Sequence, residues 1–574
     1  MFRIFGLRLP AMRIVLHFFF LALILVSCTQ ADQPIRAKGG RYYGGSFSFI
    51  SPERVSNLFP LATSDVHSQR VNAQLFETLL RINSRTMKIE PGLAKSYIFD
   101  PRKNQYTFYL RKGVMFHDDE CFEGGSRELT AEDVKFSLEM ACSGLEINKM
   151  GALFSGRIKG ADTFFRKTRT QLIPEGVKGI RVMDNYTLKI ELEKPFIGFE
   201  QLLTMSTLGI FPRKAYTYYK SELIKHPIGT GPFRLSKLDR DGLILMKNPD
   251  YWRKDNYGNQ LPFIDQISMR YNPNKKDELR AFHNKEIDFV LQIPVDEIDH
   301  VLGSIKDAKA GKNVRHRLFS QNSLSVEYIA FNCRSHLFSD ARIRLSLSKA
   351  IDRKMLINER LKGEGWPAIG GATPEFGSFK RTATENIDLT DIEQAKVLIA
   401  AAGYPNGKGF PQQKLYVNAY KGSSVHRMCL GIVDQWKKNL GIQVQIVLCS
   451  LDERNEAIAS GKASMWRSGW IADYPDPENF LNLFYGRTEK GSNKMGYFNT
   501  LFNSYFNKAL AETDINKRND LFKLCDQIVM TEAPLTPILT NDFLVMVNSR
   551  IRNFHTNPME LLDFSTIFIR EPQD

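Results

Sequence analysis

A single long apolar run near the N-terminus sets the first limit on what this chain can become. The run IVLHFFFLALILVS follows a basic segment with Arg3, Arg8 and Arg13 and leads directly into Cys28. It is shorter than the roughly 20 apolar residues that a membrane-spanning helix needs, and its length and basic flank are typical of a secretory signal peptide. We therefore expect residues 1–27 to be a signal peptide and the rest of the chain to be exported.

The residues around Cys28 indicate how the exported protein is held. Leu25, Val26 and Ser27 precede the cysteine, and this order resembles the lipobox of bacterial lipoproteins, in which the cysteine is acylated and becomes the mature N-terminus. Residues 28–42 are polar and contain glycine, which is typical of a flexible tether. We expect lipidation at Cys28 and an anchored protein. The alternative is an ordinary signal peptide beside a chance cysteine.

Length and composition predict a globular body of several domains. The chain has 574 residues, of which 43% are hydrophobic and 25% are charged. One hydrophobic core does not grow to this size, so two or three domains are expected. The formal net charge is +15, but the basic residues are scattered and form only short groups such as Lys275-Lys276. For an exported protein we therefore expect a solvated basic surface and no nucleic-acid partner.

Alternating helix and strand patterns predict a mixed α/β architecture. The segment TAEDVKFSLEMA opens with Thr130 as N-cap and Asp133 three residues later, and TDIEQAKVLIAAAGYP has Thr390 and Glu393 in the same arrangement, with Gly403 as a stop signal. KLYVNAY, SSVHRMCLGIVDQWKKNLG and IQVQIVLCS then follow each other as strand, helix and strand. Such a unit is typical of α/β domains.

The sequence contains no familiar catalytic or metal-binding motif. It has no Walker A loop, no G-x-S-x-G, no H-E-x-x-H and no C-x-x-C, and its ten histidines are dispersed. We therefore expect neither an enzyme nor a cofactor or metal site.

The cysteines other than Cys28 are even in number, which permits disulfides in an oxidising compartment. Cys121 and Cys142 flank FEGGSRELTAEDVKFSLEMA, a glycine turn and a helix that can fold back on it. We expect a disulfide between them, because closing a loop of about 20 residues stabilises by roughly 3 kcal/mol.

Several segments, read in order, carry a resemblance to a known family. The most diagnostic is IGTGPFRLSKLDRDGLILMKNPDYWRKD, with a turn at Gly229, Gly231 and Pro232. Before it stand LFETLLRINSRTMKIEPGLAKSYIF and YTFYLRKGVMFHDDE, and after it stand LPFIDQISMRY, AFHNKEIDFV, IAFNCRSHLFSDARIRLSLSKAIDR and LTPILTNDFLVMVNSRI. Together they resemble the extracytoplasmic solute-binding proteins of peptide ABC importers (family 5), from about Gly44 to Asn553.

The resemblance implies a two-lobed α/β fold, the periplasmic-binding-protein fold of type II in its large form, with an extra small domain inserted in lobe I. Ligand binds in the cleft and the lobes close by hinge rotation. The implied boundaries are 1–27 for the signal peptide, 28–42 for the tether, 43–83 for the first part of lobe I, 84–224 for the extra domain, 225–318 for the continuation of lobe I, 319–540 for lobe II and 541–574 for the return to lobe I.

The same resemblance implies a function and partners. The protein would capture di- to oligopeptides and deliver them to an inner-membrane ABC permease with its ATPase subunits, as a monomer in the periplasm or cell envelope, anchored by its lipid. Relatives with this fold bind nickel complexes, haem or sugars, and these ligands stay open as alternatives. A periplasmic chaperone or an enzyme on a borrowed fold stays open as well.

The segment SGWIADYPDPENFL holds the site residues that the resemblance implies. Asp473 corresponds to the aspartate that binds the free α-amino group of the peptide, and Trp470 to a tryptophan that lines the cleft. Arg467 corresponds to an arginine that contacts the carboxylate of short peptides in some members. Val66 lies in a loop that aligns with a cleft-lining loop. Some members have a disulfide-bonded cysteine where this chain has Ile471, which puts the transfer of fine pocket geometry in doubt.

The lipobox generates the first testable prediction. Replacing Cys28→Ser should block acylation, because the thiol that receives the lipid is gone, and leave the protein unprocessed or released. Membrane fractionation and mass spectrometry of the mature N-terminus measure this. Normal processing and continued membrane association of Cys28→Ser would contradict the lipoprotein interpretation.

Overall fold

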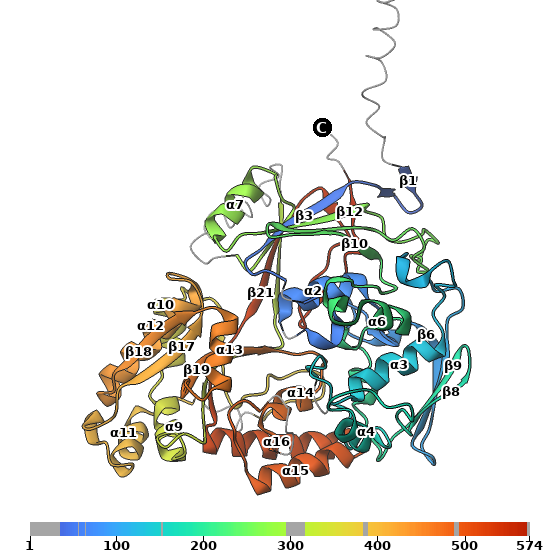
Figure 1. Ribbon diagram of the computed structural model, residues 1–574. Helices are drawn as coiled ribbons and strands as arrows, with labels where there is room; N and C mark the ends of the chain where they lie inside the picture. Colours follow the sequence, from blue (N-terminus) through green and yellow to red (C-terminus); the bar gives the residue numbers. More distant parts are fainter. Residues whose placement is uncertain are drawn as a thin grey trace, which may run out of the picture.

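The structure is a computed structural model that describes residues 35–55, 57–63, 65–150, 153–293, 316–382, 389–486 and 493–570. The predicted signal peptide and Cys28 lie outside the described residues. Two large sheets with their helices form two lobes, and a smaller sheet is attached to the first of them (Figure 1).

A seven-stranded mixed sheet forms the centre of lobe I. In spatial order its strands are β10 (Phe233–Leu238), β11 (Gly242–Lys247), β12 (Gln266–Tyr271), β3 (Ser46–Ser51), β13 (Phe289–Leu291), β21 (Asp542–Asn548) and β14 (His316–Asn322). Because side chains alternate along a strand, Phe49 and Ile50 of β3 enter different hydrophobic cores on the two faces. Helix α7 (Lys275–His283) packs on the Ile50 face.

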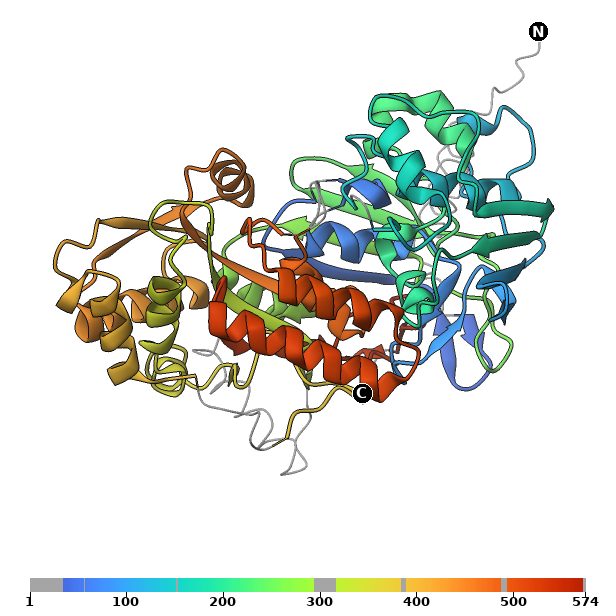
Figure 2. The same cartoon turned by 90° about the horizontal axis from the view of Figure 1, so that it is seen from below.

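A six-stranded sheet forms the centre of lobe II. Its order is β16 (Trp366–Pro367), β20 (Leu535–Thr540), β15 (Ser325–Phe331), β19 (Met465–Ile471), β17 (Gln413–Asn418) and β18 (Val444–Cys449). Helices on one face share a core with Ile329, namely α9 (Ala341–Lys349), α10 (Arg353–Arg360), α11 (Ile392–Ala401) and α12 (Ser424–Leu440). Helices on the other face share a core with Tyr328, namely α13 (Leu451–Ala459), α14 (Pro477–Leu481), α15 (Thr500–Ala511) and α16 (Ile515–Glu532). Figure 2 shows α15 and α16 side by side.

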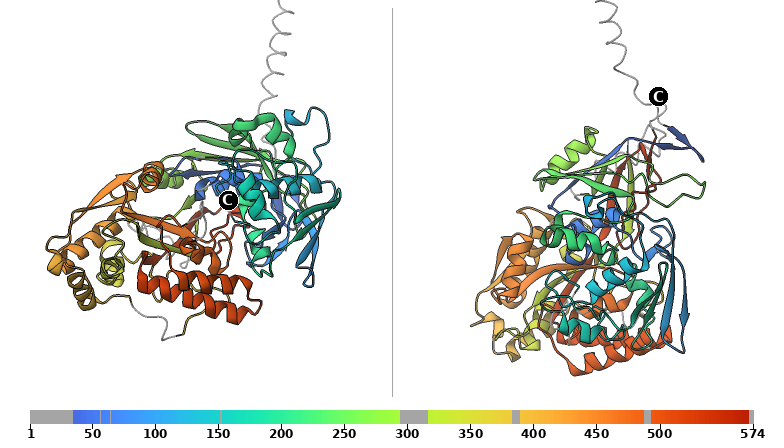
Figure 3. Two further views of the ribbon diagram at one scale, coloured as in Figure 1. Left: turned by 60° about the horizontal axis from the view of Figure 1, so that its bottom comes forward. Right: turned by 45° about the vertical axis from the view of Figure 1, so that its right-hand side comes forward.

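The smaller sheet is antiparallel and shares the core of lobe I. Its strands are β6 (Ala94–Asp100), β7 (Gln105–Leu110), β9 (Thr187–Glu191) and β8 (Ile180–Asp184), with α3 (Ala131–Cys142) and α4 (Ala161–Lys167) beside them. Phe108 and Leu188 belong to the same hydrophobic cluster as Phe47 of β3. The sheet lies on the side of the molecule opposite α9–α12 (Figure 3).

Short elements complete the described chain. The two-stranded sheets pair β1 (Ile35–Ala37) with β2 (Arg41–Tyr43), β4 (Leu80–Ile82) with β5 (Ile89–Pro91), and β22 (Ile551–Arg552) with β23 (Phe568–Ile569). Lobe I also contains α2 (Val66–Leu75), α5 (Phe199–Leu202) and α6 (Arg213–Tyr219). The 3₁₀ turns are η1 (Pro60–Ala62), η2 (Glu120–Phe122), η3 (Ser206–Leu208), η4 (Lys220–Lys225), η6 (Pro405–Gly407) and η7 (Asn482–Phe484).

Two adjacent crossings connect the lobes. The chain passes from β14 to β15 through residues 323–324 and returns from β20 to β21 at Asn541. The Ser323 amide donates to the Asn541 carbonyl oxygen at 2.9 Å, so the crossings are hydrogen-bonded to each other. The boundary predicted after residue 318 therefore falls inside β14, all of which pairs with β21 in the lobe I sheet. The other predicted domain boundaries stay predictions.

The local sequence patterns were confirmed, with one correction. Helix α3 has the capping box of Thr130 and Asp133, and β17, α12 and β18 form a strand–helix–strand unit with parallel strands. Helix α11, however, is capped by Asp391, whose side chain accepts from the Gln394 amide at 3.0 Å. The expected cap, Thr390, instead donates its hydroxyl to the Ile351 carbonyl oxygen at 3.0 Å, a contact with a segment distant in the sequence that local spacing does not predict.

The disulfide predicted between Cys121 and Cys142 is not formed in the structure, where both are free and buried. Cys121 lies in η2, which packs against α6, whereas Cys142 ends α3. A helix of this length spans about 18 Å, so α3 carries Cys142 well beyond its own start. The loop does not fold back along the helix as the prediction requires. Cys333, Cys429, Cys449 and Cys525 are free as well.

Gly229 and Gly231 are needed for close packing, which generates a stability prediction. A Cβ atom on Gly229 would lie 2.1 Å from the Leu75 carbonyl oxygen at the end of α2. Because that neighbour is backbone, Gly229→Ala should destabilise the protein by about 1–3 kcal/mol in urea or thermal unfolding. Gly113→Asn is the control, since nothing lies within 4 Å of a Cβ there and asparagine tolerates the positive φ of 72°. Equal stability of Gly229→Ala and the unchanged protein would contradict this account.

Candidate functional site

A cleft with a volume of about 1590 Å³ lies between the lobes. Lobe I lines it with one side of α2, including Val66 and Gln69, and with parts of 149–169 and 193–206. Lobe II lines it with α13, the end of β19 and the segment that follows. The cleft therefore contains the SGWIADYPDPENFL segment that the sequence singled out.

The segment after β19 leaves the sheet because its prolines and caps require it. β19 ends at Ile471, and α14 begins at Pro477 with Asp476 as N-cap, whose side chain accepts from the Glu478 amide at 2.9 Å. Proline at the first helical position fits, since its missing N–H needs no partner there. The short loop between the two elements presents Asp473 to the cleft.

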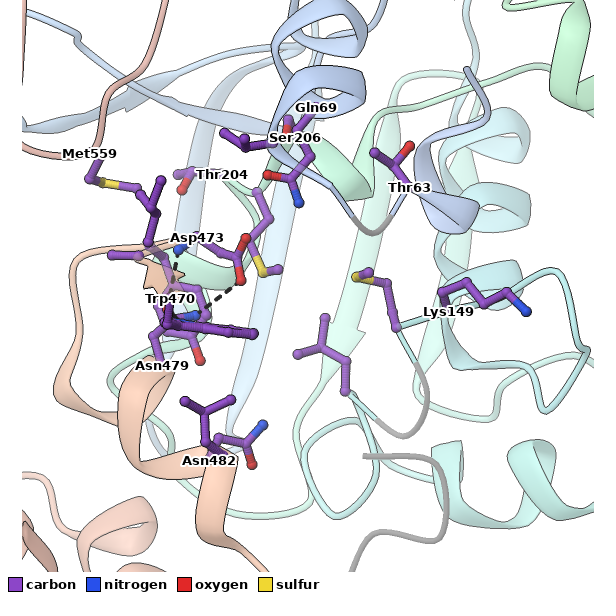
Figure 4. Close-up of a pocket in the computed structure, with 18 of the residues that line it drawn as sticks. Thr63, Gln69, Lys149, Thr204, Ser206, Trp470, Asp473, Asn479, Asn482 and Met559 are labelled. Carbon is purple, nitrogen blue, oxygen red and sulfur yellow. Dashed lines mark hydrogen bonds between the residues drawn. The ribbon is translucent and has the colours of Figure 1, made fainter. Parts of the chain in front are cut away.

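Asn479 on α14 holds the two predicted cleft residues together (Figure 4). Its side-chain oxygen accepts from the Trp470 indole N–H at 2.8 Å and from the Asp473 backbone N–H at 3.1 Å. Its amide nitrogen donates to the Asp473 carboxylate at 3.4 Å. Asn479 is 5% exposed, so these bonds fix its orientation away from bulk water.

The Asp473 carboxylate lacks a cationic partner among the described residues. Burial raises its pKa from 3.8 to about 6, and its hydrogen bonds to Asn479 and Gln69 oppose that shift. Gln69 lies on α2 in lobe I, so groups from both lobes face this carboxylate. Neutral donors solvate a buried charge only in part. The position is therefore suited to a cation supplied from the cleft.

The other predicted residues differ in their surroundings. Trp470 and Val66 both line the cleft. Arg467 lines it too, but its guanidinium forms an ion pair with Glu327 of β15, and both side chains are largely buried. Its charge is thus already neutralised within lobe II. Val66 was predicted to lie in a loop, but it is the first residue of α2, because Asp65 caps the helix directly before it.

Buried ion pairs at Asp476 and Glu478 hold the segment that contains Asp473 in place. Arg518 of α16 donates to the Asp476 carboxylate at 2.7 and 2.9 Å. Arg157 of lobe I pairs with Glu478 of α14, so this contact joins the lobes. Tyr474 is 2% exposed and belongs to the core cluster of lobe I.

Residues that sequence reasoning missed come from other elements. Gln69, Asn479, Arg454 of α13 and Lys494 all line the cleft. Glutamine, asparagine, arginine and lysine are common on surfaces, and these four have no spacing that marks them. A signal exists only for Asn479, which stands near Asp473 in the segment already identified.

The described residues contain neither a candidate membrane-spanning helix nor a candidate metal-binding cluster. None of the helices there is long and apolar enough to cross a membrane. In the same part of the chain, no group of three or more His, Cys, Asp or Glu side chains is placed to hold a metal ion.

The chain is similar to known proteins over nearly all of its length. A sequence model of the bacterial extracellular solute-binding proteins, family 5, matches residues 88–492. Heme-binding protein A of Haemophilus influenzae is 26% identical, with 93% of this chain and 95% of that protein covered. The dipeptide-binding protein of Escherichia coli is 26% identical, with 96% and 98% covered.

Solved structures share the fold. The periplasmic binding protein DppA of Helicobacter pylori, in complex with the peptide STSA, has a TM-score of 0.79 at 23% identity, covering 92% of this chain and 99% of that one. An oligopeptide-binding protein of Borrelia burgdorferi has a TM-score of 0.78 at 26% identity, covering 92% and 100%. Both matches agree with the two-lobed fold described above.

The raised pKa of Asp473 predicts a pH-dependent stability. Its pKa is about 6 in the folded protein and near 3.8 when unfolded, so the folded state binds the proton more tightly and loses stability as pH rises from 4 to 6. Asp473→Asn removes this loss. At pH 7.5 the ligand-free variant should be more stable by about 1–3 kcal/mol, and the difference should vanish below pH 4.

Thermal unfolding of the ligand-free protein between pH 4 and 8 measures this difference. Asp241→Asn, in an exposed turn, is the control and should show no such trend. A lower stability of Asp473→Asn at pH 7.5 would mean that the carboxylate supports the loop, and that its burial is compensated within the protein.

Proposed function

We propose that this chain, which belongs to the bacterial extracellular solute-binding proteins of family 5, captures peptides in the cleft between its lobes and delivers them to an inner-membrane ABC permease with its ATPase subunits. One observation carries the proposal. The Asp473 carboxylate faces the cleft with only neutral donors around it among the described residues.

A peptide α-ammonium has the chemistry that this position lacks. An ammonium that enters a closed cleft loses its water, and a fixed carboxylate can replace that water. Asp473 then gains a charged partner while Asn479 keeps the carboxylate in place. The site would accept free N-termini and reject blocked ones, since an acetylated amine carries no charge.

Trp470 and Val66 complete the proposed contacts. Trp470 offers a flat apolar wall whose indole N–H is already bonded to Asn479, and Val66 lines the cleft from α2. Main-chain groups can pair with a peptide as an added strand, which does not depend on the ligand's side chains. A contact of Arg467 with a ligand carboxylate stays a prediction. Glu327 already neutralises the Arg467 charge, and a ligand carboxylate would have to compete with it.

Attachment and assembly belong to the same proposal. The protein would be held in the cell envelope by a lipid on Cys28 and act as a monomer, with residues 28–42 as tether. Similarity to a relative named for haem keeps haem as a second ligand class. The position of Asp473 favours an amine-bearing ligand over haem, since haem presents carboxylates and Asp473 would repel them.

The proposal predicts a defined loss on removing the Asp473 charge. Asp473→Asn keeps the volume, and the affinity for a free peptide should fall by roughly 2–5 kcal/mol, the range for breaking a buried charge pair. An N-acetylated version of the same peptide should bind the unchanged protein poorly and lose little more on mutation.

Titration calorimetry with both peptides on both proteins decides between a contact and a general effect on the loop. Asn482→Asp changes the charge at another position of the same cleft, and it serves as the control for a general effect of charge on binding. Equal losses for the free and the acetylated peptide would contradict a contact with the amine.

A further inference from the structure

A buried carboxylate ties the first crossing to lobe I. Glu560 is 3% exposed, and Leu562, two residues further on, belongs to the core cluster of lobe I. Oε2 of Glu560 accepts from Arg70 of α2 at 2.7 Å, and Oε1 accepts from the Ser323 hydroxyl at 2.8 Å. Ser323 lies between β14 and β15. The carboxylate therefore links an arginine of lobe I to the chain that leaves this lobe.

A second carboxylate ties the other crossing to lobe II. Glu327 lies on β15, and its side chain is 13% exposed. Its Oε2 accepts from Arg467 of β19, and its Oε1 accepts from the side-chain amide of Asn541 at 3.1 Å. Asn541 lies between β20 and β21. Glu327 thus has the same arrangement in lobe II that Glu560 has in lobe I.

The two links form one continuous polar chain through the hinge. The Ser323 amide donates to the Asn541 carbonyl oxygen at 2.9 Å and joins them. The chain begins at Arg70 and ends at Arg467, and both arginines line the cleft. Ser323 and Asn541 themselves are not among the described residues that line it. The hinge is therefore bonded to both walls of the cleft without being part of either wall.

Rotation of the lobes would change these bonds. The backbone dihedral angles at the crossings change when the lobes turn about them, whereas Glu560 and Glu327 each move with the lobe that holds them. The hydroxyl or amide on the turning backbone then moves away from its carboxylate, and hydrogen bonds weaken steeply with distance and angle. The bonds therefore favour the arrangement in which they form, where Arg157 and Glu478 join the lobes.

We propose that Glu560 and Glu327 are positioning residues that hold the hinge in its closed setting and so slow the release of bound peptide. The inference rests on the proposed peptide function and deepens it, because it assigns the rate of release to residues at the hinge. Hydrogen bonds to charged groups are about twice as strong as those between neutral groups, which suits this role. Loss of either link lowers the closed fraction, and the ligand leaves sooner.

Substitutions at the crossings test this role without changing the cleft lining. Ser323→Ala removes the hydroxyl that donates to Glu560, and Asn541→Ala removes the amide that donates to Glu327. Each should raise the dissociation rate of a bound peptide roughly tenfold, since one bond to a charged group is lost from the closed form. The association rate should change by less than about threefold, because the peptide enters the open form.

Stopped-flow tryptophan fluorescence measures both rates, since Trp470 lines the cleft. The probes are alanine peptides with free N-termini, from dipeptide to hexapeptide, and the tightest binder is used. Glu560→Gln keeps the size of the side chain but loses the charge that faces Arg70, so it should also speed release. In the double variant with Ser323→Ala the two effects should be less than additive, because both changes act on one link.

Asp288→Asn is the matched control. Asp288 is a carboxylate of lobe I that is 1% exposed and accepts from Arg550 at 2.6 Å, and it precedes β13 rather than a crossing. Asp288→Asn and Glu560→Gln each break a buried ion pair and should lower the stability to unfolding. Only Glu560→Gln should speed the release of peptide.

The outcomes separate this inference from the proposed function. If Ser323→Ala and Asn541→Ala both release the peptide at the unchanged rate, the hinge role is refuted and the amine site is unaffected. Equally fast release by Asp288→Asn and Glu560→Gln would mean a general loss of stability and would also refute it. If no alanine peptide binds the unchanged protein, the proposed function and this inference fail together. Faster release by the crossing variants, with normal release by Asp288→Asn, supports the role.

Discussion

Buried ion pairs hold the segment that presents Asp473 to the cleft. Arg518 holds Asp476, and Arg157 reaches from lobe I to Glu478 on α14. Breaking a buried pair leaves an uncompensated charge, at a cost of about 3–5 kcal/mol. The loop between β19 and α14 is therefore confined at its far end, and Asn479 aligns Trp470 and Asp473 from there.

The same cleft contains a charge that the described protein leaves without a counterion. Asp473 has only neutral donors among the described residues. Paired charges beneath the site give rigidity, whereas an unpaired charge on its wall gives affinity for a ligand of opposite charge. The free protein loses some stability through it, which is a common property of binding sites.

Two adjacent chain crossings connect the lobes among the described residues. Ser323 and Asn541 lie side by side and share a hydrogen bond, so the two crossings are adjacent. Such paired crossings suit a hinge, because few dihedral angles need to change. The contact of Arg157 with Glu478 joins the two lobes, and it would have to part for them to separate there.

Local and tertiary information divide clearly in this protein. Short-range rules alone determined the α/β class, the capping box at Thr130 and the strand–helix–strand unit around α12, because caps and periodicity act within a few residues. The segment that contains Asp473 was identified through the family resemblance. The ordered resemblance added the two lobes. Tertiary structure decided the rest. It paired Arg467 with Glu327, bonded Ser323 to Glu560 and kept Cys121 and Cys142 as free thiols. These outcomes depend on which side chains from distant segments meet, and packing decides that, whereas spacing along the chain does not.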